Sequence, residues 1–211
     1  MGDHRIMMSM AVPYELTGRT QQKARTRHAL VDAARELLAA GTTPTVEQAA
    51  DASQVARATA YRYFPNQRAL LIATYPQIDE PSLLDDAGLT DPAERLDAVA
   101  GALTRQILEH EPELRTMLRL SLEPDLAERG DLPFRKGRRI TWVADALAPL
   151  RGTLPDPELD RLIDAIAAVL GVEMVVWLTD IAGHTREQAR EIMRWSARAL
   201  LQAALSGDSS K

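Results

Sequence analysis

The sequence contains no cysteine, few aromatic residues and no long uninterrupted apolar run. Without cysteine there is no disulfide framework, no thiolate zinc site and no cysteine nucleophile. The longest apolar stretch, residues 163–178, is interrupted by Asp164 and Glu173, which argues against a membrane span. The first 14 residues lack the apolar segment and the small-residue cleavage site of a secretory signal. We therefore expect a cytoplasmic protein with no membrane partner.

Motifs of enzymes are also missing. The sequence has no G-x-S-x-G, no P-loop and no G-x-G-x-x-G pattern. Its four histidines are far apart in the sequence, and none belongs to a metal-ligand spacing. These absences predict a protein that is not an enzyme and that uses no metal or cofactor.

Charge is distributed unevenly along the chain. The whole sequence has 25 basic and 30 acidic residues, a net charge of −5, which by itself disfavours a nucleic-acid partner. Residues 19–70, however, hold eight basic and four acidic residues, a net charge of +4. Residues 71–211 hold 16 basic and 24 acidic residues, a net charge of −8. A basic N-terminal region joined to an acidic remainder indicates that any contact with nucleic acid lies in the first 70 residues.

Twelve prolines divide the chain into segments with helical periodicity and almost no alternating β-branched runs. The pattern predicts an all-α protein of about nine helices, with Thr45, Asn66 and Thr185 as N-caps. The segment 76–92 is rich in proline and acidic residues and predicts a connection, and Pro124–Pro133 predicts a loop. The expected helices span about 22–40, 46–52, 57–64, 66–75, 92–111, 112–123, 134–150, 158–182 and 185–205.

Residues 45–64 predict two short helices joined by a tight turn at Ser53–Val55, a helix-turn-helix arrangement. Ala60 and Phe64, at i and i+4, are expected to face inward. The outward residues of the second helix then combine arginine with tyrosine, which suits contacts to phosphates and base edges of DNA. These outward residues are Arg57, Thr59, Tyr61, Arg62 and Tyr63.

The stretch from about Arg25 to Tyr75 resembles the DNA-binding domain of the TetR/AcrR family of transcriptional repressors. The residues that match the family pattern are Thr45, Ala50, Val55, Thr59, Tyr61, Phe64 and Leu70. Four positions depart from the pattern: Gln54 replaces the turn glycine, Ala56 a serine, Tyr63 a histidine, and Gln67 the lysine that usually touches phosphate. We expect Gln67 to be a weaker contact, with Arg68 supplying a neighbouring charge.

The resemblance implies a set of DNA contacts. These are Arg25, Thr45, Arg57, Ala58, Thr59, Tyr61, Tyr63 and Gln67. A structural role competes with this interpretation at several positions, because Thr45 can simply cap its helix and Tyr61 can belong to the core. The basic arm around Arg25 can equally be a solvated terminus.

The resemblance also implies two domains, residues 19–75 for DNA binding and residues 76–206 for ligand binding and dimerisation. The expected long helix 158–182 is apolar nearly all round, which favours cover by a second subunit. The candidate interface residues are Val169, Val172, Val176, Trp195 and Ala199, and the candidate residues of a largely apolar pocket are His110, Met117, Trp142, Met174 and Trp177. Both sets can alternatively be ordinary core.

The sequence thus predicts a homodimeric, ligand-responsive repressor that binds a palindromic operator of double-stranded DNA and releases it when a small molecule binds. Two alternatives stay open. One is a small-molecule carrier or enzyme that retains a degenerate helix-turn-helix, and the other is a helical adaptor that binds another protein.

Overall fold

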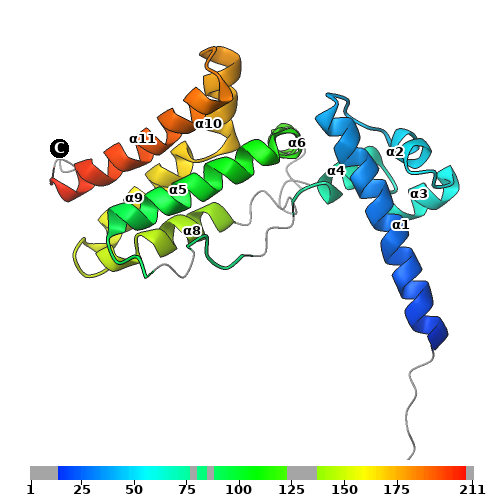
Figure 1. Cartoon of the computed structure of the whole chain (residues 1–211), viewed down its shortest axis with the longest axis horizontal. Coiled ribbons are helices and arrows are strands. Elements are labelled where there is room, and N and C mark those ends of the chain that lie inside the picture. The colour runs from blue at the N-terminus through cyan, green and yellow to red at the C-terminus, as the bar shows by residue number, and fades with distance from the viewer. Residues whose placement is uncertain (1–13, 77–79, 85–87, 123–136, 208–211) are drawn as a thin grey trace, which may run out of the picture. The chain divides into compact units, whose positions relative to one another are not determined.

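The structure is a computed structural model that describes residues 14–76, 80–84, 88–122 and 137–207. Within these ranges the chain forms ten α-helices and no β-strand, which confirms the all-α prediction (Figure 1). The loop predicted at Pro124–Pro133 lies outside the described residues. The chain divides into two compact units, Met1–Thr74 and Tyr75–Lys211.

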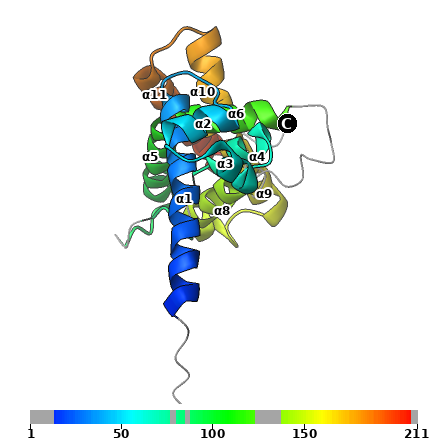
Figure 2. The same cartoon turned by 90° about the vertical axis from the view of Figure 1, so that its right-hand side faces the viewer.

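The first unit contains α1 (Tyr14–Ala39), α2 (Val46–Ala52), α3 (Arg57–Tyr63) and α4 (Gln67–Ala73). Its apolar core begins at Leu30 on α1, and the side chains of residues 20–29 are almost all exposed. Both views show the N-terminal half of α1 extending beyond α2, α3 and α4 (Figures 1 and 2). Helix α1 therefore starts earlier than residue 22, where the apolar periodicity predicts its start. The periodicity misses the first turns because they have no apolar face to bury.

The end of α1 is fixed to the end of α4. Gly41, with φ of 80°, ends α1 in the left-handed conformation that glycine adopts without steric cost. Arg35 of α1 donates from Nε to the backbone oxygen of Thr74, at 3.1 Å. The Thr74 hydroxyl is buried and donates to the oxygen of Leu71, at 2.7 Å. The first and last helices of this unit are thereby joined at one point.

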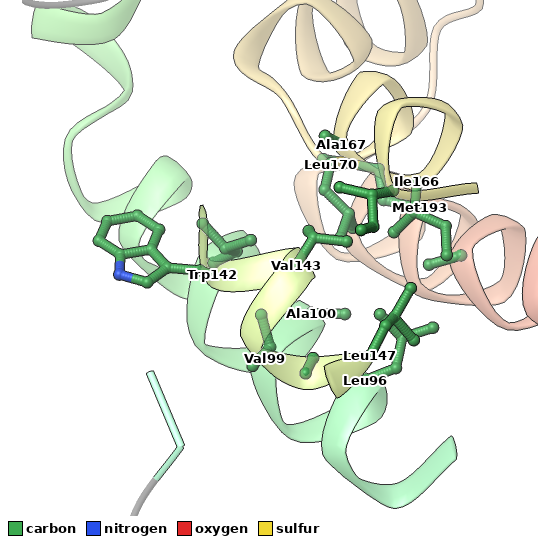
Figure 3. Packing of buried hydrophobic residues seen from close by; sticks show 14 of the residues in the cluster. Leu96, Val99, Ala100, Trp142, Val143, Leu147, Ile166, Ala167, Leu170 and Met193 are labelled. Atoms are coloured by element: carbon green, nitrogen blue, oxygen red, sulfur yellow. The ribbon is translucent and has the colours of Figure 1, made fainter. Parts of the chain in front are cut away.

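The second unit packs α5 (Pro92–Glu109), α8 (Arg138–Ala146), α9 (Asp156–Val169) and α11 (Arg186–Leu205) around one apolar core. Figure 3 shows Leu96 and Val99 of α5, Val143 of α8, Leu147 directly after α8, and Met193 of α11 within this core. Helix α6 (Glu111–Ser121) follows α5 and contacts α10 (Val172–Val176).

Side-chain caps begin two of these helices. Asp91 caps α5 by accepting from the backbone nitrogens of Ala93 and Glu94, at 3.1 and 3.0 Å, and Thr185 caps α11 in a capping box with Gln188. Such caps are worth about 1 kcal/mol each.

The connection predicted at residues 76–92 packs in part against the second unit. Leu83 belongs to its core, and the hydroxyl of Ser82 donates to Oδ2 of Asp145, at 2.5 Å. The indole nitrogen of Trp142 donates to the backbone oxygen of Glu80, at 2.9 Å. The described part of this segment is thus anchored, which its proline-rich and acidic composition did not indicate.

The prediction of a single helix over residues 158–182 is wrong. The chain leaves the helical conformation at Leu170 and Gly171, and α10 passes directly into a π-helical turn, Trp177–Ile181. Gly171 is extended, with φ of −113° and ψ of 164°. A Cβ atom built at this position would lie 1.8 Å from Nη1 of Arg139 and 2.0 Å from Oε2 of Glu173. The Arg139–Glu173 ion pair thus occupies the space that a side chain at position 171 would need.

No single helix among the described residues is long and apolar enough to cross a membrane. The bent pair of Asp156–Val169 with Val172–Ile181 passes such a test only when its two parts are taken together.

Candidate nucleic-acid interface

Helix α2 is set in place by a capping box. The hydroxyl of Thr45 accepts from the backbone nitrogen of Gln48, at 3.2 Å, and the Gln48 side chain accepts from the nitrogen of Thr45, at 2.8 Å. Thr45 is therefore an N-cap, the structural role that competed with DNA contact at this position. Its side chain is still exposed at a helix N-terminus, where the backbone amides favour an anion such as phosphate.

The turn between α2 and α3 is held without a glycine. Gln54 adopts a φ of 56°, in the left-handed region that costs a residue with a side chain about 1–2 kcal/mol. The nitrogen of Val55 donates to the oxygen of Ala50, at 2.9 Å, and the Ser53 hydroxyl donates to the oxygen of Ala49, at 2.7 Å. Val55 packs against the core of the unit. This turn fixes how α3 projects from α2.

Helix α3 buries one face and exposes the other. Ala60 and Phe64 are buried, as their spacing predicts. The exposed face consists of Arg57, Ala58, Tyr61 and Arg62, with Thr59 half-buried. Tyr63 is also half-buried and packs against the core, so only part of its side chain is available to a ligand. The first turn of α3 thus offers a cation, a methyl group and a hydroxyl, which are the groups that read base edges.

Two acidic residues of α2 bind the two prominent polar side chains of α3. Arg57 donates from Nε and Nη2 to the carboxylate of Asp51, and the Tyr61 hydroxyl donates to Oε1 of Glu47. The hydrogen bond from Arg57 lowers the pKa of Asp51, and the one from Tyr61 lowers the pKa of Glu47. The same bonds raise the pKa values of Arg57 and Tyr61. At neutral pH Asp51 and Glu47 therefore stay deprotonated, and Arg57 and Tyr61 stay protonated. The hydrogen bonds orient the side chains of α3 without changing their charge.

Gln67 and Arg25 differ in how the structure holds them. The Gln67 amide donates from Nε2 to the backbone oxygen of Pro44, at 3.0 Å, so one of its two N–H donors is used within the unit. Asn66 caps the same helix by accepting from the nitrogen of Ala69, at 2.8 Å. Arg25 is exposed on the projecting half of α1, and Arg27 lies over the Phe64 ring at 5.4 Å. Arg27 therefore ties α1 to α3 through a cation–π contact.

Sequence reasoning missed the acidic partners. Asp51 and Arg57 are six residues apart and lie on different helices, so the i, i+4 rule for one helix does not relate them. Glu47 and Tyr61 are 14 residues apart. The helix-turn-helix arrangement brings these pairs together, so the spacing of residues within one helix does not predict them.

The second unit contains a cavity of about 420 Å³. Its walls come from α5, the start of α6, the start of α8 and the break at Leu170–Val172, together with Tyr75 and Pro76. Of the predicted pocket residues, Trp142 lines this cavity. The others do not: Met117 is fully buried, His110 and Met174 are half-buried outside the lining, and Trp177 points to solvent with 56% of its surface exposed. Periodicity could not separate Met174 and Trp177 from residues of the cavity, because it does not anticipate the helix break at Leu170 and Gly171.

The predicted dimer residues are divided by burial. Val172 is 2% exposed and belongs to the core, so its side chain offers almost no surface to a second subunit. Val169, Val176 and Ala199 are half-buried, and Trp195 is 64% exposed. Trp177 and Ile181, in the π-helical turn that packs against α11, add further exposed apolar surface.

Helix α3 is exposed on one face, follows a tight turn and packs on the short helix α2. This is the arrangement of a helix-turn-helix DNA-binding domain. Residues 30–74 match the model of the bacterial regulatory proteins of the tetR family. A search of the curated proteins finds no match. The solved structures that match include a TetR transcriptional regulator from Rhodococcus sp. RHA1, which is 20% identical, with a TM-score of 0.51 over 87% of this chain and 97% of that chain. At this identity the likeness shows a shared fold.

The match identifies a DNA-binding domain of the tetR type and, with it, a transcriptional regulator. Residues 30–74 carry the DNA-binding region of the family.

Proposed function

We propose that this regulator is a ligand-responsive repressor that binds a palindromic operator as a homodimer. The observation that carries the proposal is the exposed first turn of α3, where Arg57, Ala58 and Thr59 stand next to the N-terminus of the helix. In a helix-turn-helix, this turn enters the major groove. Arg57 is placed to bind guanine or phosphate, and the Ala58 methyl is small enough to contact a thymine methyl.

The proposed contacts to the DNA backbone come from residues around α3. Thr45 and Tyr61 supply hydroxyl groups, and Arg25 supplies a charge on the projecting half of α1. Tyr63 and Gln67 contribute less, because Tyr63 packs partly in the core and the Gln67 amide donates to Pro44. Such contacts position the protein on DNA, and only the first turn of α3 reads sequence.

Dimerisation is supported by the exposed apolar side chains of Trp177, Ile181 and Trp195. These residues lie on two elements that pack together, and a contiguous exposed apolar patch on a soluble protein marks an interaction site. A twofold dimer holds two copies of α3 about 34–36 Å apart, the spacing of successive major grooves on one face of DNA. One seven-residue helix reads few base pairs, so the second copy supplies specificity.

Ligand response is supported by the cavity in the second unit, whose walls are largely apolar with a few polar groups, as in small-molecule sites. Binding there changes the separation of the two α3 helices in the dimer and moves them out of groove register. A coupling free energy of about 1–3 kcal/mol would change operator affinity roughly 5–150-fold.

A gel shift tests the DNA-binding part. Native protein is titrated onto the DNA upstream of its own gene and onto a scrambled duplex, at several salt concentrations. We expect sequence-preferring binding that weakens steeply with salt, because bound phosphates release counterions. Arg57→Ala should cost about 1–3 kcal/mol of operator affinity, whereas Arg151→Ala, an exposed arginine of the second unit, should change nothing.

The alternatives give different results in the same experiment. Binding without sequence preference or salt dependence would favour a carrier or enzyme with a degenerate helix-turn-helix. Co-elution with a different protein, in place of a homodimer, would favour an adaptor.

A further inference from the structure

The cavity of the second unit is lined by two arginines whose guanidinium groups are both engaged. Arg139, at the start of α8, pairs with Glu173, from Nη1 to Oε2 at 3.1 Å and from Nη2 to Oε1 at 3.5 Å. Its neighbour Arg138 lies over the Tyr75 ring, with Cζ 5.5 Å from the ring centre. Neither arginine therefore offers a free charge to an occupant.

Ions of either sign are disfavoured in this cavity. A ligand anion has to displace Glu173 or draw Arg138 from the Tyr75 ring, and a charge that is buried without a partner is costly. A ligand cation finds no counter-ion, because no aspartate or glutamate is among the described lining residues. The groups around the cavity therefore favour an uncharged ligand.

One polar side chain of the lining has an unused acceptor. Gln106 lines the cavity from α5, and its Oε1 is buried without a hydrogen-bond partner in the described part of the chain. Buried polar atoms are nearly always paired, so an unpaired amide oxygen beside a cavity points to an occupant that donates a hydrogen bond.

Most of the remaining wall is apolar and surrounds the body of a ligand. Leu103 and Ile107 of α5 and Leu114 of α6 line the cavity together with the Trp142 ring. The Trp142 indole nitrogen donates to the backbone oxygen of Glu80, at 2.9 Å, so this N–H is not available to a ligand acceptor. The volume of about 420 Å³ is within the range of small-molecule sites.

We propose that this cavity binds an uncharged molecule with an apolar body and one hydroxyl group, and that Oε1 of Gln106 accepts the hydrogen bond of this hydroxyl. The inference rests on the proposed ligand response and names the chemical class of the ligand. A hydroxyl is favoured over an amide N–H, because an amide brings a carbonyl oxygen that needs a donor of its own. Burial of the apolar body supplies most of the affinity, and the hydrogen bond to Gln106 orients the ligand.

The same cavity brings the ligand against the chain that leads from the DNA-binding unit. Tyr75 and Pro76 line the cavity and directly follow Thr74, the last residue of the first unit. A ligand whose apolar body packs against Tyr75 and Pro76 acts on the chain at the point where it enters the second unit, without displacing an ion pair.

Calorimetric titration of the full-length protein without DNA tests the proposal, with 4-phenylbutan-1-ol and octan-1-ol as probes. Each alcohol is compared with its carboxylic acid, which carries a charge, and with its methyl ether, which lacks the donor. We expect at least one alcohol to bind about threefold or more tightly than both analogues. The carboxylate loses hydration without gaining a free partner, and a hydrogen bond between neutral groups is worth about 2–10-fold in affinity.

Two results would overturn the proposal. One is a smaller ratio for both alcohols in either comparison, since the charge or the donor would then not decide binding. The other is failure of both alcohols to bind at concentrations up to about 2 mM, where compounds of this size with good ligand efficiency are detected.

Two variants locate the hydrogen bond. Gln106→Leu keeps a similar shape and removes the amide, so the alcohol should lose about threefold or more in affinity while the methyl ether is unchanged. Gln22→Leu, which replaces an exposed glutamine of the first unit, should leave both constants unchanged. An unchanged ratio of alcohol to ether affinity in Gln106→Leu would also overturn the proposal, whatever its effect on stability.

A gel shift with the same compounds separates this inference from the proposed function. Alcohols that bind without releasing DNA would leave the ligand class standing and refute the ligand-responsive repressor. Release of DNA by a charged compound, with no binding of the alcohols, would do the reverse.

Discussion

Arg57 binds Asp51 through two hydrogen bonds across the turn between α2 and α3, from Nε to Oδ1 at 3.2 Å and from Nη2 to Oδ2 at 2.7 Å. Both side chains are mostly exposed, so water screens the pair and its contribution to stability is small. The pair holds the arginine in one conformation and places a carboxylate on the surface that we propose to face DNA.

We predict that Asp51→Asn increases affinity for DNA of arbitrary sequence. The change removes one negative charge from the DNA-facing surface and leaves Arg57 available to phosphate. The gain should be about 2–10-fold at low salt and should shrink as salt is raised, because surface charges are screened. Fluorescence anisotropy with a scrambled duplex measures it, with Glu158→Gln in the second unit as the control. A loss of affinity would mean that orientation of Arg57 matters more than charge.

Gln67→Lys should increase the salt dependence of operator binding. The glutamine donates to Pro44 at 3.0 Å, whereas a lysine gives up that bond and reaches a phosphate. Each added phosphate contact steepens the slope of log affinity against log salt by about 0.9. Binding measured at four or more salt concentrations gives the slope, and Gln67→Ala, which loses the Pro44 bond without adding charge, is the control. An unchanged slope would place this residue away from the DNA backbone.

Gln54→Gly should stabilise the first unit. The glutamine has a φ of 56°, and relief of this left-handed conformation by about 1–2 kcal/mol exceeds the extra entropy that glycine gives the unfolded chain, about 0.4–1 kcal/mol. The net gain is about 0.5–1 kcal/mol, read as a higher urea midpoint. Gln54→Val should lower the midpoint, because a β-branched residue tolerates this conformation least. If both variants shift the midpoint in the same direction, backbone strain at this turn is not the cause.

A pH dependence of stability is expected at Asp180. Hydrogen bonds from Arg115 and Thr179 lower its pKa to about 2. Because the folded pKa lies below the unfolded value of about 3.9, the carboxylate stabilises the fold above pH 4, and this contribution is lost as the pH falls toward 2. The Asp180 side chain is 49% exposed, so screening limits the effect to under about 1 kcal/mol.

Urea denaturation of native protein and Asp180→Asn measures this contribution. The native protein should be the more stable at pH 6, and the difference between the two should shrink as the pH is lowered below about 4. Glu187→Gln, which removes an exposed carboxylate paired within α11, is the control for a general charge effect. A difference that stays constant over this range would refute the assignment.

Trp195→Asp should convert the proposed dimer to a monomer. The side chain is 64% exposed in the single chain, so the folded subunit loses little when it is replaced. A charge buried in an apolar interface is costly unless it is paired, and two are introduced by symmetry. Light scattering coupled to size exclusion reports the mass, and circular dichroism checks that the helices remain. A dimer that survives with unchanged stability would place the interface elsewhere.

The features that sequence predicts best are local. Thr45, Asn66 and Thr185 cap their helices as expected, because a cap depends on residues within one turn. Ala60 and Phe64 are buried because they lie on one face of a short helix. The all-α architecture follows from the same periodicity.

The features that sequence does not predict are contacts between elements. The guanidinium that lies against the break at Gly171 belongs to Arg139, 32 positions earlier, and no apolar pattern shows this contact. Trp177 follows the apolar stripe of the expected helix, yet the break and the π-helical turn direct it to solvent. The acidic partner of Arg57 and the acceptor for Gln67 likewise come from other segments.

The hydrogen bond from Arg35 to the oxygen of Thr74 bears on how a signal enters the DNA-binding unit. Thr74 is the last residue of that unit, so any displacement passed along the chain arrives there first. Because Arg35 belongs to α1, a displacement of Thr74 acts on α1 as well as on α4. The contact of Arg27 with the Phe64 ring connects α1 in turn to the residue that follows α3. In the proposed ligand response, a substitution that removes the hydrogen bond from Arg35 to Thr74 would loosen the connection between α4 and α1 and would weaken the coupling of ligand to DNA without altering either site.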